Sequence, residues 1–127
     1  MTLKIKIYTD STGYVPAEII EEKNPKTAEA IIKALPIESR VNRWGEEVYF
    51  STNVRQEEEK SQEEVEVGDL GYWPPGKAFC IFFGRTPAST SSKPRAASPV
   101  NVFGRVTGDP KVFSKTKSGE KIRVEKA

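Results

Sequence analysis

Histidine is absent from this chain of 127 residues, and cysteine occurs once, as Cys80. Without an imidazole the chain can form no Ser-His-Asp triad, Cys-His pair or histidine metal site, because each needs that ring as base, acid or ligand. A single cysteine also forms no intrachain disulfide and no zinc cluster. Cys80 lies in the apolar run Phe79–Phe83, where a thiol is more often a small buried hydrophobe than a nucleophile. We therefore assign no metal and no cofactor, and we rank nucleophilic catalysis last.

Long apolar runs are missing as well, since no stretch approaches the roughly 18 residues that a membrane helix needs. The first residues also lack the positive, apolar and small-residue pattern of a signal peptide. We therefore expect a cytoplasmic protein that does not contact membranes. A length of 127 residues is typical of one domain. Residues 1–127 are predicted to form a single domain, as a monomer or a weak homodimer.

Charge is distributed unevenly along the chain. Residues 1–67 carry nine Lys and Arg against fourteen Asp and Glu, whereas residues 68–127 carry eleven against four. The second half could form a nucleic-acid face. Its candidate cations are Arg85, Lys93, Arg95, Arg105 and Lys121. Two oppositely charged halves that fold over one core would give the same distribution, and we favour that interpretation.

The N-terminal residues predict a β-hairpin. Apolar Leu and Ile alternate with Lys over residues 3–8, which is the period-2 pattern of a half-buried strand. Residues 10–13 read Asp-Ser-Thr-Gly, a turn composition, and a second apolar stretch follows at 14–20.

A helix is expected to follow the hairpin, with Asn24 as its N-cap and Pro25 in its first turn. Pro36 should end it. The apolar residues between follow i, i+3, i+4, i+7 spacing and form one stripe, made of Ala28, Ile31, Ile32 and Leu35.

The remainder is predicted to be mostly β, because short runs rich in β-branched and aromatic residues alternate with turn clusters that contain glycine. The expected strands cover residues 37–41, 48–51, 64–67, 77–83, 100–106 and 122–124. The run Phe79–Phe83 is apolar throughout, which is typical of a strand covered on both faces. A second short helix is expected between Pro110 and Gly119.

Two polar segments and a set of aromatic residues leave their roles open. Gln56–Glu64 is mostly Glu, Gln and Lys, and we interpret it as a solvated connection. Arg85–Pro99 is either an ordinary surface loop or a loop that carries binding residues. Trp44, Tyr72 and Trp73 either line a ligand groove or cover the core at a barrel corner.

Four stretches of the sequence resemble a known family. Val15–Ile31 resembles a strand and the first helix of the cyclophilins, which are peptidyl-prolyl isomerases, and Val102–Val106, Val-Phe-Gly-Arg-Val, resembles their Val-Phe-Gly-Lys-Val strand. Val41–Thr52 and Gly68–Ala78 are similar to the small prokaryotic cyclophilin-like domains, whose function is unsettled. The resemblance implies a mainly β fold, a closed eight-stranded antiparallel barrel capped by two short helices.

The resemblance also suggests a catalytic residue. Prolyl isomerisation needs no nucleophile, since its barrier of about 18–20 kcal/mol comes from amide resonance. An arginine aimed at the prolyl nitrogen weakens that resonance, and cyclophilins carry it in a Phe-His-Arg-Val stretch. Glu38–Val41 is similar to this stretch, so the resemblance implies that Arg40 is the catalytic residue.

The family's Phe and His are replaced here by Glu38 and Ser39. We therefore expect a side groove near Arg40 that binds a peptide segment or a small ligand, with weak or no isomerase activity. The residues expected to bind the ligand are Tyr49, Phe50, Trp73, Phe79, Phe83 and Asn101. The first alternative is an active isomerase that uses Arg40, and the second is nucleic-acid binding through the basic half, which we favour least.

Overall fold

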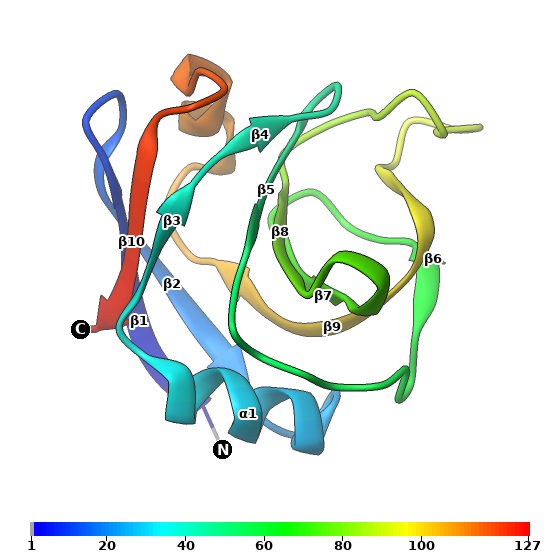
Figure 1. The fold of residues 1–127 in the computed structure, drawn as a ribbon. Helices are drawn as coiled ribbons and strands as arrows, with labels where there is room; N and C mark the ends of the chain where they lie inside the picture. The colour runs from blue at the N-terminus through cyan, green and yellow to red at the C-terminus, as the bar shows by residue number, and fades with distance from the viewer. Residues whose placement is uncertain (1) are drawn as a thin grey trace.

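The computed structural model describes residues 2–127, which form an antiparallel sheet with helices at its two ends (Figure 1). The strands are β1 (Thr2–Thr9), β2 (Gly13–Ile20), β3 (Ile37–Arg40), β4 (Asn42–Arg43), β5 (Glu47–Ser51), β6 (Gln62–Glu64), β7 (Asp69–Trp73), β8 (Ala78–Phe82), β9 (Arg95–Val106) and β10 (Lys121–Lys126). The helices are α1 (Pro25–Ala34) and the 3-10 helices η1 (Pro74–Gly76) and η2 (Pro110–Lys115). No helix in this part of the chain is long and apolar enough to cross a membrane.

The sheet is mainly β as predicted, but it is not the closed eight-stranded barrel that the resemblance implied. Its ten strands follow the order β3-β10-β1-β2-β9-β7-β8-β5-β4, with β6 paired to β9 beside this path. β3 and β4 lie at the two ends of this order, and the chain connects them directly through the single residue Val41. The backbone N–H of Val41 donates to Glu120 O (2.9 Å), and its carbonyl accepts from Gly119 N (2.8 Å). β3 and β4 do not pair with each other, so hydrogen bonds do not close the sheet.

The predicted hairpin and first helix are confirmed. Strands β1 and β2 pair in register from Thr2 with Ile20 to Thr9 with Gly13. Helix α1 buries Ala28 and Ile31 of its apolar stripe against the core.

Asn24 is the N-cap residue as predicted, but its side chain makes no capping hydrogen bond, because it is used elsewhere. Its Nδ2 donates to Val102 O (2.7 Å), and its Oδ1 accepts from Lys60 N (2.7 Å). The first turn of α1 is instead capped by the carboxylate of Glu59. This group accepts from the backbone N–H groups of Lys26 (3.2 Å) and Thr27 (3.1 Å). The segment that we interpreted as a solvated connection therefore holds the helix N-terminus.

Strand β8 separates two hydrophobic clusters, which confirms the prediction of a strand covered on both faces. Every residue of β8 is buried. Alternation along it and into the next residue sends Phe79, Ile81 and Phe83 to the main core. The opposite face belongs to the second cluster, which contains Ala78, Cys80, Phe82, Val65, Ala96, Val100 and Val102.

β4 was not expected, and β6 covers Gln62–Glu64 rather than the expected 64–67. β7 and β9 differ from the predicted pattern as well. β7 was not expected, and it contains Gly71, where a β-carbon would lie 3.1 Å from Val100 Cγ2, closer than most such contacts. β9 begins at Arg95, inside the segment predicted to be a loop, because β6 pairs with it there. The second predicted helix is confirmed as the shorter η2. In both β7 and β9, pairing with neighbouring strands therefore outweighed the preference of the local composition.

The uneven charge is neutralised within the fold. Of the six side-chain ion pairs in residues 2–127, four join a cation of the second half to a carboxylate of the first. These four are Lys93–Glu66, Arg95–Glu63, Arg105–Glu18 and Arg123–Glu38. The two halves therefore attract each other across the structure, as the favoured interpretation of the sequence expected.

Candidate functional site

Arg40 lies at the end of β3 and faces a groove of about 710 Å³. Residues of β3, β10, β5 and the β1–β2 hairpin line this groove. The side chain of Arg40 is exposed, whereas Ile37, at the start of β3, is buried, because successive residues of a strand point to opposite faces.

The register of β3 and β10 places a second cation beside Arg40. Lys121 is the partner of Arg40 in this antiparallel pair, and Arg123 is the partner of Glu38. Residues directly opposite each other in an antiparallel pair project their side chains to the same face. The groove therefore carries Arg40 and Lys121 side by side, followed by Glu38 and Arg123.

The other charged groups in this groove have partners. Arg123 forms ion pairs with Glu38 and, at 3.0 Å, with Glu125. Asp10 accepts a hydrogen bond from the Tyr8 hydroxyl (3.0 Å), and this bond raises the pKa of Tyr8. Arg40 and Lys121, the remaining cations of the groove, have no such charged partner among residues 2–127.

Neither Arg40 nor Lys121 forms an ion pair within residues 2–127. The one hydrogen bond of the Arg40 guanidinium runs from Nη1 to Gly119 O (2.8 Å). Two cations without a counter-ion thus lie opposite each other on the groove wall.

The three phenylalanines that we expected to line the ligand site lie in the core instead. Phe50, Phe79 and Phe83 have no exposed surface. Phe50 stacks on Phe79 with ring centroids 4.9 Å apart, and Phe79 meets the edge of Phe103 at 5.1 Å. These positions alternate toward the main core, so none of the three lines the Arg40 groove.

Asn101 is also buried and does not face a cavity. Its Nδ2 donates to Thr27 Oγ1 (3.0 Å) and to Glu57 O (2.9 Å), while its Oδ1 accepts from Glu59 N (2.9 Å). The side chain therefore fastens the 57–59 segment to α1 rather than offering itself to a ligand.

Tyr49 and Trp73, the remaining predicted residues, come together in a different place. With Trp44 and Ala97 they line a small cavity of about 190 Å³. The Nε1–H of Trp73 donates to Ser98 Oγ (2.7 Å), which fixes the ring. Of the aromatic residues that the sequence left open, Tyr72 lies in the core and the two tryptophans line this cavity.

The cyclophilin-like family model matches residues 2–125 of this chain. The chain belongs to the cyclophilin-like family. A solved structure of a hypothetical protein from Archaeoglobus fulgidus is similar to this cyclophilin-like chain, with 43% sequence identity and a TM-score of 0.80. The similarity covers 98% of the present chain and 95% of the other. No curated protein matches it. The matches confirm the resemblance drawn from the four sequence stretches, and they attach no activity to it.

The cyclophilin-like chain also buries a carboxyl group that the sequence did not single out. Glu47 is 5% exposed, and burial raises the pKa of its carboxyl to about 7. The buried thiol of Cys80 lies against it, and burial raises the pKa of Cys80 as well. The sequence signal that could have revealed Glu47 is its position directly before the apolar residues Val48–Phe50, in a segment that becomes strand β5.

Proposed function

We propose that this cyclophilin-like domain binds a peptide segment or small ligand in the Arg40 groove, through an anionic group of the ligand, with little or no isomerase activity. The observation that carries the proposal is the pair of cations, Arg40 and Lys121, that face each other there without a counter-ion. Like charges directly opposite in a sheet destabilise it. An anion bound between them would relieve that repulsion.

The chemistry of the two side chains favours a carboxylate or a similar oxyanion. A guanidinium offers five N–H donors in a planar fork that matches such groups. Gly119 O engages one nitrogen of Arg40, which holds the guanidinium in the groove. Lys121 supplies a second, compact charge. The hydroxyls of Ser39 and Ser51 line the same groove and can bind the polar backbone of a peptide.

The isomerase alternative has less support. An arginine accelerates prolyl isomerisation only where the prolyl amide is desolvated beside it. The aromatic residues expected to provide that environment, Phe50, Phe79 and Phe83, are buried in the core. None of them is among the residues that line the Arg40 groove.

Nucleic-acid binding through the basic half has less support, because three of its five candidate cations are already paired. Lys93, Arg95 and Arg105 each pair with a carboxylate of the first half. Phosphate binding would have to break these contacts.

Two peptides that differ in one charge test the proposal. Succinyl-Ala-Ala-Pro-Phe anilide carries a carboxylate, and its acetyl analogue does not. We expect the succinyl peptide to bind about tenfold more tightly, because one charge-assisted hydrogen bond contributes about 1.5–3 kcal/mol. Arg40→Gln and Lys121→Gln should each remove most of that preference in calorimetric titrations. Lys33→Gln, which removes an exposed charge from α1, is the matched control.

Equal affinities for the two peptides, or a preference that survives Arg40→Gln, would count against the proposal. Added salt should reduce the preference, since it screens exposed charges. Unfolding midpoints of the variants establish that each is folded.

A further inference from the structure

Three aromatic side chains from separate segments converge on one small cavity. Trp44 comes from the turn between β4 and β5, Tyr49 from β5 and Trp73 from the end of β7. Ala97 of β9 completes the wall of a space of about 190 Å³. A pocket for a drug-sized ligand usually measures about 300–1,000 Å³. This cavity therefore suits a chemical group of a few heavy atoms.

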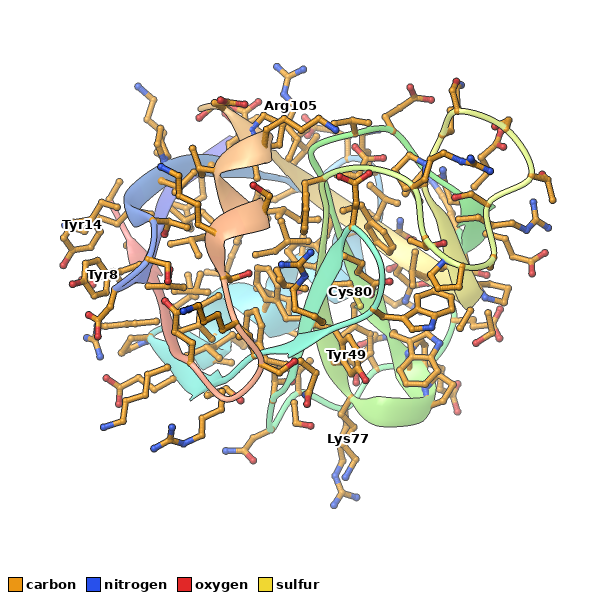
Figure 2. All side chains as sticks on the ribbon, turned by 90° about the horizontal axis from the view of Figure 1, so that it is seen from above. Tyr8, Tyr14, Tyr49, Lys77, Cys80 and Arg105 are labelled. Carbon is orange, nitrogen blue, oxygen red and sulfur yellow. The ribbon has the colours of Figure 1, made fainter. Side chains whose placement is uncertain are left out.

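A buried carboxyl group, which does not itself line the cavity, shares a strand face with two of these rings. Trp44 and Glu47 exchange backbone hydrogen bonds of 3.0 and 3.2 Å, so they form a directly opposed pair whose side chains share a face. Tyr49 follows Glu47 by two residues along β5 and projects to that face too. Cys80 is the cross-strand partner of Tyr49, and Figure 2 shows the two residues in the same region.

No cation among residues 2–127 is placed over these three rings. Within residues 2–127 the cations placed over aromatic rings are Lys6 over Tyr14 and Arg43 over Phe83. Glu47 forms no ion pair among these residues. The indole of Trp73 is held in place by its hydrogen bond to Ser98.

We propose that the pocket of Trp44, Tyr49 and Trp73 binds a methylated ammonium group. The negative faces of several aromatic rings attract such a cation, and indole does so most strongly. A primary ammonium is strongly hydrated and needs hydrogen-bond acceptors, whereas methyl groups suit aromatic walls. The group could belong to a free choline-type molecule or to a methylated lysine of a protein. This site shares no lining residue with the Arg40 groove, so the two proposals stand or fall separately.

The carboxyl of Glu47 adds charge complementarity and a dependence on pH. Burial raises its pKa to about 7, and a nearby cation favours the ionised form. Affinity should therefore rise between pH 6 and pH 8. The other titratable side chains on this face are Tyr49, the Cys80 thiol, whose pKa burial raises, and Asp69 of β7, which lies across Phe82. Arg43 of β4 is bonded to carbonyls of Gly45, Ser114 and Thr116.

Choline and its neutral carbon isostere, 3,3-dimethylbutanol, test for recognition of the cation. The chain has two tryptophans, both in the pocket, so their two indole N–H signals in NMR spectra report binding directly. We expect saturable shifts of both signals and about tenfold tighter binding of choline, because the negative ring faces attract its positive charge and do not attract the neutral isostere. Equal binding of the isostere, or no shift with either compound, would overturn the proposal.

Variants separate the roles of the residues. Tyr49→Leu should weaken choline binding about fivefold, whereas Tyr49→Phe, which keeps a ring face, should retain it. Glu47→Gln should abolish the rise in affinity between pH 6 and pH 8. Tyr14→Leu removes an exposed aromatic side chain elsewhere and is the control. Unchanged affinity in Tyr49→Leu would contradict the assignment, and Trp73→Leu provides a second test should the first variant not fold.

A trimethyllysine peptide and its unmodified counterpart distinguish the sources of the group. Tighter binding of the methylated peptide than of choline indicates a protein partner, and the reverse order a small molecule. Either order supports the proposal. Tighter binding of the unmodified peptide than of the methylated one would overturn it.

Discussion

Replacing Gly104 with alanine is expected to lower the free energy of unfolding by about 3 kcal/mol, the upper end of the usual cost of overpacking. A β-carbon on Gly104 would lie 2.2 Å from the carbonyl oxygen of Glu18, a backbone atom of β2. Strand β2 cannot move aside, because β1 pairs with it on one side and β9 on the other. The glycine of the Val-Phe-Gly-Arg-Val stretch thus permits the close approach of two strands.

Chemical denaturation measures this loss, and Gly13→Ala provides the comparison. Gly13 has a φ of +67°, yet a β-carbon there would meet nothing within 4 Å. Its substitution should cost only the strain of the left-handed backbone, about 1–2 kcal/mol. A loss at Gly104 no larger than the loss at Gly13 would show that the β2–β9 contact is not the constraint described here.

Glu47→Gln is expected to stabilise the protein by about 3 kcal/mol at pH 8 and to change it little near pH 4.5, since each pKa unit corresponds to about 1.4 kcal/mol. Burial raises the pKa of the Glu47 carboxyl from 4.5 to about 7. Between these values the folded protein keeps a proton that the unfolded chain releases. The wild type therefore loses stability as pH rises from about 4.5 to 7, and the loss is complete above that range. Glutamine resembles the protonated carboxyl in shape and does not ionise.

Urea unfolding of both proteins between pH 4.5 and pH 8 checks this prediction. The difference between the two curves isolates Glu47 from the other titrating groups. Glu58→Gln, which removes one exposed carboxylate, is the control for net charge. A difference that stays constant with pH, or that favours the wild type at pH 8, would contradict the account of Glu47.

The elements predicted correctly are those whose own residues carry a clear periodic or apolar pattern. The β1–β2 hairpin and α1 follow from strict alternation and from a helical stripe, and the apolar run of β8 correctly indicated two covered faces. β7 escaped prediction because its pairing with β9, a strand far along the chain, outweighed the local composition. Glu59 caps α1 from more than thirty residues away, so Asn24 was the only cap that the sequence offered locally.

The candidate site likewise contains residues that a local sequence pattern reveals and residues whose position depends on the whole fold. Arg40 could be named from a short sequence resemblance, but its partner Lys121 is set by the β3–β10 register, which no local pattern reveals. Phe50 and Phe79 looked like pocket residues because an aromatic residue has the same sequence signal in a pocket and in a core. Tyr49 and Trp73 were expected in the groove of Arg40, but they line a separate cavity, because their separation from Arg40 depends on the path of the whole sheet.

The central claim, that the Arg40 groove binds without catalysing isomerisation, is tested most directly by NMR exchange spectroscopy of the succinyl peptide. Its cis and trans proline forms give separate signals, because they interconvert over tens to hundreds of seconds unaided. We predict that the protein broadens or shifts these signals, through Arg40, without exchange peaks between them. Exchange peaks that disappear with Arg40→Gln would show an active isomerase and contradict the account.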